Sequence, residues 1–91
     1  MFLKDPAARL DYGLDWTDRL NEGRSILESS WSVEPAEADG LSIAESSRQA
    51  NLCLAVLEGG IAGRIYRVSN RIGISDGSID ERSIVVRVDQ R

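Results

Sequence analysis

The sequence contains no histidine, a single cysteine and no long hydrophobic run. Without histidine, the chain lacks the commonest general base, the commonest metal ligand and any Ser-His or Cys-His nucleophile pair. A single cysteine, Cys53, cannot form an internal disulfide, which argues against a disulfide-framed secreted module. No window approaches the ~18 consecutive apolar residues of a membrane-spanning helix, and the first residues lack the apolar run of a signal peptide. We therefore expect no membrane segment and synthesis in the cytoplasm.

The acidic side chains are the remaining candidates for catalysis or metal binding, and their spacing fits neither role. Asp11 and Asp15 point to one face of an expected strand, about 13 Å apart along it, which is too far for two carboxylates to cooperate directly. The acidic cluster at 76–81 lacks the alternating spacing of a calcium loop. Cys53 lies within an apolar stretch, so we expect an inert core thiol. The sequence thus predicts no enzyme, no cofactor and no metal site.

The charges are unevenly distributed along the chain. Residues 1–46 hold ten acids and four bases, a net charge of −6, whereas residues 47–91 hold five acids and seven arginines, a net charge of +2. The overall charge of −4 argues against nucleic-acid binding. Arginine is the base favoured at protein interfaces, because its planar fork binds carboxylates and stacks on aromatic rings. The alternative is two solvated sheet faces that differ in charge by chance.

Alternating apolar and polar residues predict β-strands along most of the chain. Leu27 and Trp31 fall on the expected inner face of one strand, and Trp31 is a plausible central core residue. The stretch 51–58 is apolar on both faces, which is typical of a strand covered on both sides. The expected strands lie at 10–16, 27–33, 41–44, 51–58, 66–74 and 84–88.

The glycine-rich run 59–63 raises the question of a phosphate-binding loop. Such a loop opens a helix, whose N-terminal amides meet the anion. Here the run is followed by Arg64-Ile65-Tyr66-Arg67-Val68, which alternates as a strand does. The glycines therefore indicate a turn of the chain between strands.

Short strands separated by regularly spaced turn signals predict an all-β fold, an immunoglobulin-like or fibronectin-III-like two-sheet sandwich of six or seven strands. Tyr66, three residues after Gly63, occupies the position of a corner tyrosine, whose hydroxyl bonds to upstream backbone. We expect residues 1–9 to form an extended N-terminal arm and residues 10–91 to form a single sandwich domain.

Several segments, in this order, resemble those of small virion proteins of tailed bacteriophages known as fiber–tail adaptor proteins. The resemblance extends from Lys4 to Val88, whereas the loop region 34–50 contributes little to it. It rests on an acidic-aromatic first strand, a tryptophan strand, a G-G-x-x-G-x-x-Y motif and a terminal D-E-R-S strand. The segments are LDYGLDWTDRL (10–20), SILESSWSV (25–33), LEGGIAGRIYRVSNRI (57–72) and DERSIVVRV (80–88).

The resemblance implies a non-enzymatic structural protein with an immunoglobulin-like fold. Such a protein is made in the host cytoplasm and joins the virion in several copies, around the head–tail neck or the tail. Its implied partners are tail-fiber proteins and portal, adaptor or neck proteins.

The charge asymmetry suggests how such copies contact one another. An acidic part and an arginine-bearing part on one domain allow front-to-back contacts, which close into rings when the rotation permits. Exposed strand edges are a second route, because they accept a strand from a neighbouring arm. The candidate interface residues are Arg64, Arg67, Arg71 and Arg87 on one side, and Asp11, Asp15 and Asp18 on the other.

A carbohydrate- or protein-binding module on the virion surface is the alternative function. A sugar-binding sandwich needs exposed aromatic side chains on one face, and the chain has five aromatic residues in all. With Tyr12, Trp31 and Tyr66 expected in the core, Trp16 and Phe2 are the candidates for exposed anchors.

Overall fold

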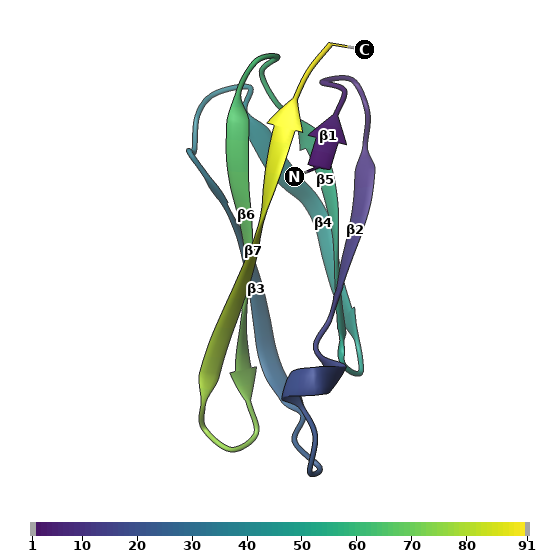
Figure 1. The fold of residues 1–91 in the computed structure, drawn as a ribbon, viewed down its shortest axis with the longest axis vertical. Helices are drawn as coiled ribbons and strands as arrows, with labels where there is room; N and C mark the ends of the chain where they lie inside the picture. The colour runs from purple at the N-terminus through teal and green to yellow at the C-terminus, as the bar shows by residue number, and fades with distance from the viewer. Residues whose placement is uncertain (1, 91) are drawn as a thin grey trace.

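The computed structural model describes residues 2–90, and within them the chain forms seven β-strands and one short 3₁₀ helix (Figure 1). Met1 of the expected arm and Arg91 at the end of the expected sandwich lie outside the described residues. The elements are β1 (Phe2–Lys4), β2 (Leu10–Asp15), η1 (Thr17–Arg19), β3 (Ile26–Glu34), β4 (Leu41–Gln49), β5 (Leu52–Gly59), β6 (Ile65–Ile74) and β7 (Ile79–Val88).

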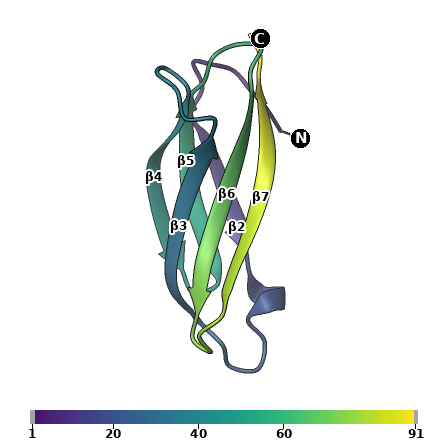
Figure 2. The same cartoon turned by 90° about the vertical axis from the view of Figure 1, so that its left-hand side faces the viewer.

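The strands form two sheets that pack face to face. One sheet has four strands in the order β1-β7-β6-β3, and the other has three in the order β2-β5-β4. Figure 2 shows β3, β6 and β7 side by side in one layer, with the three-stranded sheet behind them. Neighbouring strands are antiparallel except β1 and β7, which are parallel. The predicted all-β sandwich is confirmed. The closer immunoglobulin-like assignment stays a prediction, which the strand order and the corner tyrosine favour.

The core lies between the sheets and follows from the alternation of side chains along each strand. On β6 the even-numbered residues from Tyr66 to Ile74 are all buried, and Cys53, Ala55 and Leu57 alternate in the same way on β5. The apolar members of these two sets form two clusters. One cluster includes Val86 and Val88, and the other surrounds Trp16. Cys53 is fully buried, as predicted.

Trp16 is fully buried in one of the two apolar clusters, and the expectation that it is an exposed anchor is wrong. The chain leaves β2 at Asp15 and turns into η1, which carries the Trp16 indole under one end of the sandwich, where it is fully buried. Trp31 is half-buried and packs against both apolar clusters. Its ring meets that of Tyr12 edge-on, with centroids 6.0 Å apart.

Leu27 was expected on the inner face of its strand, and this prediction is also wrong. The pairing of β3 with β6 shifts by one residue between Ile26 and Glu28, which is the mark of a β-bulge. Ile26 therefore enters the core, whereas Leu27 is 64% exposed. Because a bulge changes the side on which every residue before it lies, simple alternation fails there.

The apolar stretch 51–58 forms β5, the central strand of the three-stranded sheet. It was expected to be covered on both sides, but within the described chain only one side faces the other sheet. Leu52, Leu54 and Val56 lie on the opposite side and remain half-buried. The outer side of β5 is thus an apolar stripe on the surface of the sandwich.

The glycine run turns the chain from one sheet to the other, as predicted. Gly60 has φ +106°, and a Cβ atom there would lie 2.6 Å from Val88 Cγ2, so both the backbone and the packing require glycine.

The Tyr66 hydroxyl accepts a hydrogen bond from the Ile61 N–H (3.1 Å) and donates one to Glu37 (2.7 Å). The predicted corner tyrosine therefore bonds to upstream backbone. Burial, followed by the Glu37 contact, raises the pKa of Tyr66 above its usual range.

Within the segment expected to be an extended arm, Phe2–Lys4 pairs with β7 in parallel. Lys4 is only 2% exposed, and its ammonium group donates hydrogen bonds to the carbonyl oxygens of Gly59 (2.7 Å) and Asp5 (2.9 Å). Desolvation lowers the pKa of Lys4, against the opposing effect of Asp5 and Glu58. A buried lysine thus ties the start of the chain to the glycine turn.

Candidate interaction surfaces

Three of the four candidate arginines lie on the outer face of the four-stranded sheet. Arg67 and Arg71 project from β6 on the side opposite the buried Tyr66 and Ile72, and Arg87 projects from β7. We call this outer surface of β1, β7, β6 and β3 the arginine face. Arg64 precedes β6 in the turn after the glycine run and is also exposed.

The arginine face is mixed in charge rather than uniformly basic. In the strand register, Arg67 lies between Glu34 of β3 and Val85 of β7, and Arg71 is opposite Glu81. Arg87 forms an ion pair with Asp89 (3.0 Å). By contrast, the guanidinium groups of Arg64, Arg67 and Arg71 have neither an ion pair nor a hydrogen bond within residues 2–90, so they are available to a partner.

The candidate acids lie on the opposite side of the molecule. Asp11 and Asp15 project from β2 on the outer face of the three-stranded sheet, where Glu45 of β4 and Glu58 of β5 also lie. We call this outer surface of β2, β5 and β4 the acidic face. Asp18 is exposed in η1, beyond the end of β2. The structure therefore places the two candidate sets on opposite faces and brings none of these arginines to these acids within one chain.

The carboxylates of the acidic face differ in how they are held. Arg9 lies between Glu45 (3.4 Å) and Glu58 (3.8 Å) and offsets part of their charge. The Asp15 carboxylate accepts hydrogen bonds from the hydroxyl and the N–H of Thr17, which lower its pKa. Within residues 2–90, the Asp11 carboxylate forms no ion pair and accepts no hydrogen bond.

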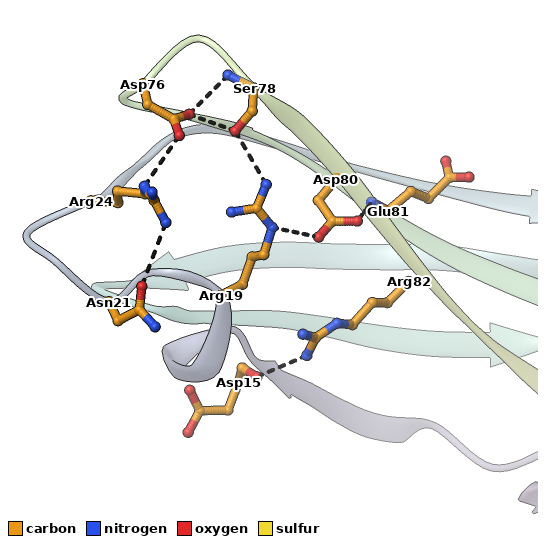
Figure 3. Close-up of polar contacts among 9 residues, drawn as sticks. All are labelled: Asp15, Arg19, Asn21, Arg24, Asp76, Ser78, Asp80, Glu81 and Arg82. Atoms are coloured by element: carbon orange, nitrogen blue, oxygen red, sulfur yellow. Dashed lines mark hydrogen bonds and ion pairs between the residues drawn. The ribbon is translucent and has the colours of Figure 1, made fainter.

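The sequence reasoning missed a polar network at the end of the sandwich farthest from the glycine turn (Figure 3). Arg19 of η1 binds Asp80 at the start of β7 (2.9 Å) and Ser78 (3.3 Å). Arg24 binds Asp76 in the β6–β7 turn (3.2 Å). These contacts fasten the β2–β3 connection to the β6–β7 hairpin, and their role is structural.

The Asp76-Gly77-Ser78 sequence is the one local signal for part of this network. An Asp-Gly pair is typical of a hairpin turn, and a carboxylate in such a turn bonds its own backbone two residues later. Asp76 accepts bonds from the Ser78 hydroxyl and N–H, which, with a smaller contribution from Arg24, lower its pKa. The pairing with Arg19 and Arg24 could not be found from the sequence, because the partners are about fifty or more residues apart.

Arg82 has a second structural role near the same end. Its guanidinium carbon lies 4.3 Å from the centroid of the Trp16 ring, a cation–π contact, and its Nη1 donates to the Asp15 carbonyl oxygen (3.5 Å). Arg82 therefore covers the buried tryptophan and is not part of the arginine face.

The aromatic surface that a sugar-binding sandwich needs is small. Trp16 is buried, and Phe2 is 44% exposed with its ring edge-on to Tyr12, centroids 5.5 Å apart. Within residues 2–90, neither a cluster of potential metal ligands nor a helix long and apolar enough to cross a bilayer is found.

Comparison with known proteins gives a family for this chain. The family model described as "Podophage GP4 fiber-tail adaptor protein gp77" matches residues 4–87. No curated protein sequence matches the chain. The matched range includes all the candidate interface residues and covers most of the sandwich.

Proposed function

The chain belongs to the podophage GP4 fiber-tail adaptor family of bacteriophage structural proteins, and we propose that it is a multi-copy virion component that joins tail fibers or neighbouring neck proteins to the tail. The observation that carries this proposal is the family match over residues 4–87. An adaptor of this kind works by holding two partners at a fixed distance and orientation.

The arrangement of charged side chains supports an adaptor role. The arginine face and the acidic face lie on opposite sides of one domain, so each can contact a different neighbour. In the proposed contact, Arg64, Arg67, Arg71 and Arg87 meet carboxylates such as Asp11, Asp15 and Asp18 of an adjacent subunit or neighbouring protein. Contacts between two different surfaces of like subunits generate rings when the rotation closes, which suits placement around the axis of a tail.

The same sandwich supplies the rigidity that an adaptor needs. Its long axis measures 44 Å, and Arg19 and Arg24 fasten the loops at one end to the β6–β7 hairpin. At the other end, Lys4 and Tyr66 fasten the first strand and the glycine turn.

The experiment that tests this function compares virions assembled with and without the chain. Particles lacking it are expected to have tails without fibers, and electron microscopy should locate the chain between tail and fiber in complete particles. Particles that are complete and fibered without the chain would show that the proposed function is wrong. Complementation with Arg67→Glu/Arg71→Glu is expected to fail. Arg48→Glu should restore the fibers, because Arg48 is exposed on β4 but pairs with the inward-facing Cys53 and so lies on neither outer face.

A further inference from the structure

The apolar stripe on β5 is a surface that the isolated chain leaves without a cover. Leu52, Leu54 and Val56 point away from the core, although their strand is apolar on both sides. Gly13, opposite Leu54 on β2, accommodates these side chains, because a Cβ atom there would lie only 3.0 Å from Leu54 Cδ2 and 3.5 Å from Leu52 Cδ1. A short continuous apolar run is consistent with a strand covered on both faces, and the described chain supplies only one of the two covering layers.

Carboxylates border this stripe. Asp11 and Asp15 lie on one side of it, on β2, and Glu45 lies on the other, on β4. An open hollow between them is lined by Asp11, Glu45, Ser47, Leu54 and Val56. The missing layer should therefore bring apolar side chains to the middle and positive charge to the β2 side.

The arginine face of the same chain has these properties. Leu3, Ile65 and Ile79, each more than half exposed, lie on it beside the half-buried Val85. Arg67 and Arg71 are four residues apart on β6, as Asp11 and Asp15 are on β2. At the rise of a strand, both separations are about 13 Å.

We propose that the arginine face of a second copy of this chain covers the β5 stripe of the first, with Arg67 and Arg71 facing Asp11 and Asp15. The inference rests on the multi-copy part of the proposed function and specifies its interface. Since each copy presents both surfaces, the contact repeats from copy to copy. Glu34 and Glu81, which neighbour the two arginines, disfavour sliding of one sheet over the other and so fix the register.

Charge reversal on the purified full chain tests the proposal without any other virion protein. Asp11→Arg/Asp15→Arg makes the β2 side of the acidic face basic, and Arg67→Glu/Arg71→Glu makes the centre of the arginine face acidic. Sedimentation velocity should show concentration-dependent association of the wild type and its loss, by at least about tenfold in apparent affinity, in each double variant. Mixed in equal amounts, the two variants should associate again, because each contact between one variant and the other pairs opposite charges.

Two further variants separate loss of the contact from loss of the fold. Arg48→Glu makes the same charge change as each arginine reversal but lies on neither face, so it should associate as the wild type does. Leu54→Gln should weaken association with an unchanged circular dichroism spectrum.

A wild type that stays monomeric at its highest soluble concentration, or a mixture that fails to regain association, would overturn the inference. In that case, fibers that are present on virions with the chain and absent from virions without it would still support the proposed function. Virions that carry fibers without the chain would count against the function itself.

Discussion

The Trp16 indole N–H donates a 2.8 Å hydrogen bond to Asn70 Oδ1 in the core between the two sheets. The same Asn70 side chain donates to the Ser29 hydroxyl (2.9 Å) and to the Ser30 carbonyl oxygen (3.0 Å). One buried amide on β6 thus joins Trp16, at the start of η1, to β3.

Asn70→Leu is expected to lower the free energy of unfolding by about 2–3 kcal/mol, because it leaves the buried Trp16 N–H without an acceptor. Chemical denaturation measures the change. Asn21→Leu serves as the control, since Asn21 is exposed and its side chain accepts only a 3.5 Å bond from Arg24. A double variant with Trp16→Phe should lose less than the sum of the two single changes, and strict additivity would contradict the coupling.

Gly60→Ala is expected to be more destabilising than Gly77→Ala. Both glycines have positive φ (+106° and +90°), but only at Gly60 does the added methyl group meet a side chain, Val88 Cγ2 at 2.6 Å. The expected losses are about 2–3 kcal/mol at Gly60 and about 1 kcal/mol at Gly77. Thermal unfolding of the two variants gives the comparison, and equal losses would mean that the packing against Val88 is of no consequence.

Tyr66→Phe is expected to cost about 1–2 kcal/mol of unfolding free energy, because the Ile61 N–H and Glu37 both lose the hydroxyl as a partner. Glu37→Gln keeps an acceptor oxygen for the Tyr66 hydroxyl and should cost less. Amide hydrogen exchange at Ile61 provides a local readout: exchange should accelerate in the phenylalanine variant and stay slow in the glutamine variant. The reverse order would show that the corner is held by other contacts.

Stability is expected to fall in acid partly through Asp15 and Asp76. In the folded chain, hydrogen bonds from Thr17 and Ser78 lower the pKa values of these two carboxyl groups below their ordinary value of 3.8. As the pH falls through this value, the unfolded state takes up protons first, so the stability that is present above about pH 4 is lost below it. Asp76→Asn and Ser78→Ala should each flatten the dependence of the unfolding free energy on pH between about 5 and 2. An unchanged slope in both variants would exclude this contribution.

The fold was predictable where local signals agreed. Period-two alternation located Tyr66, Val68 and Ile72 on the inner face of β6, and the glycine run before them marked the change of sheet. The corner tyrosine followed from its spacing to Gly63. These features depend on residues close together in the sequence, which is why the sequence alone was sufficient.

The errors arose where tertiary packing overrode alternation. The bulge between Ile26 and Glu28 exposes Leu27, and the turn after Asp15 fully buries Trp16, which was a candidate for an exposed anchor. Neither a bulge nor the direction of a loop is encoded in a hydrophobic period.

Alternation along the strands predicts that Arg67 and Arg71 point outward from one strand, and that Asp11 and Asp15 point outward from another. It does not predict that the two faces lie back to back, because that depends on the strand order.

The parallel pairing of β1 with β7 has a mechanical consequence. Phe2–Lys4 runs alongside Val86–Val88 in the same direction, so a force that pulls the start of β1 away from the end of β7 acts along the two strands in opposite directions. The hydrogen bonds between these strands are then loaded together in shear rather than opened one after another, and the Lys4 bond to Gly59 adds an anchor beside them. Tension applied between the start of β1 and the end of β7 would therefore meet more resistance than tension that separates the two strands one hydrogen bond at a time.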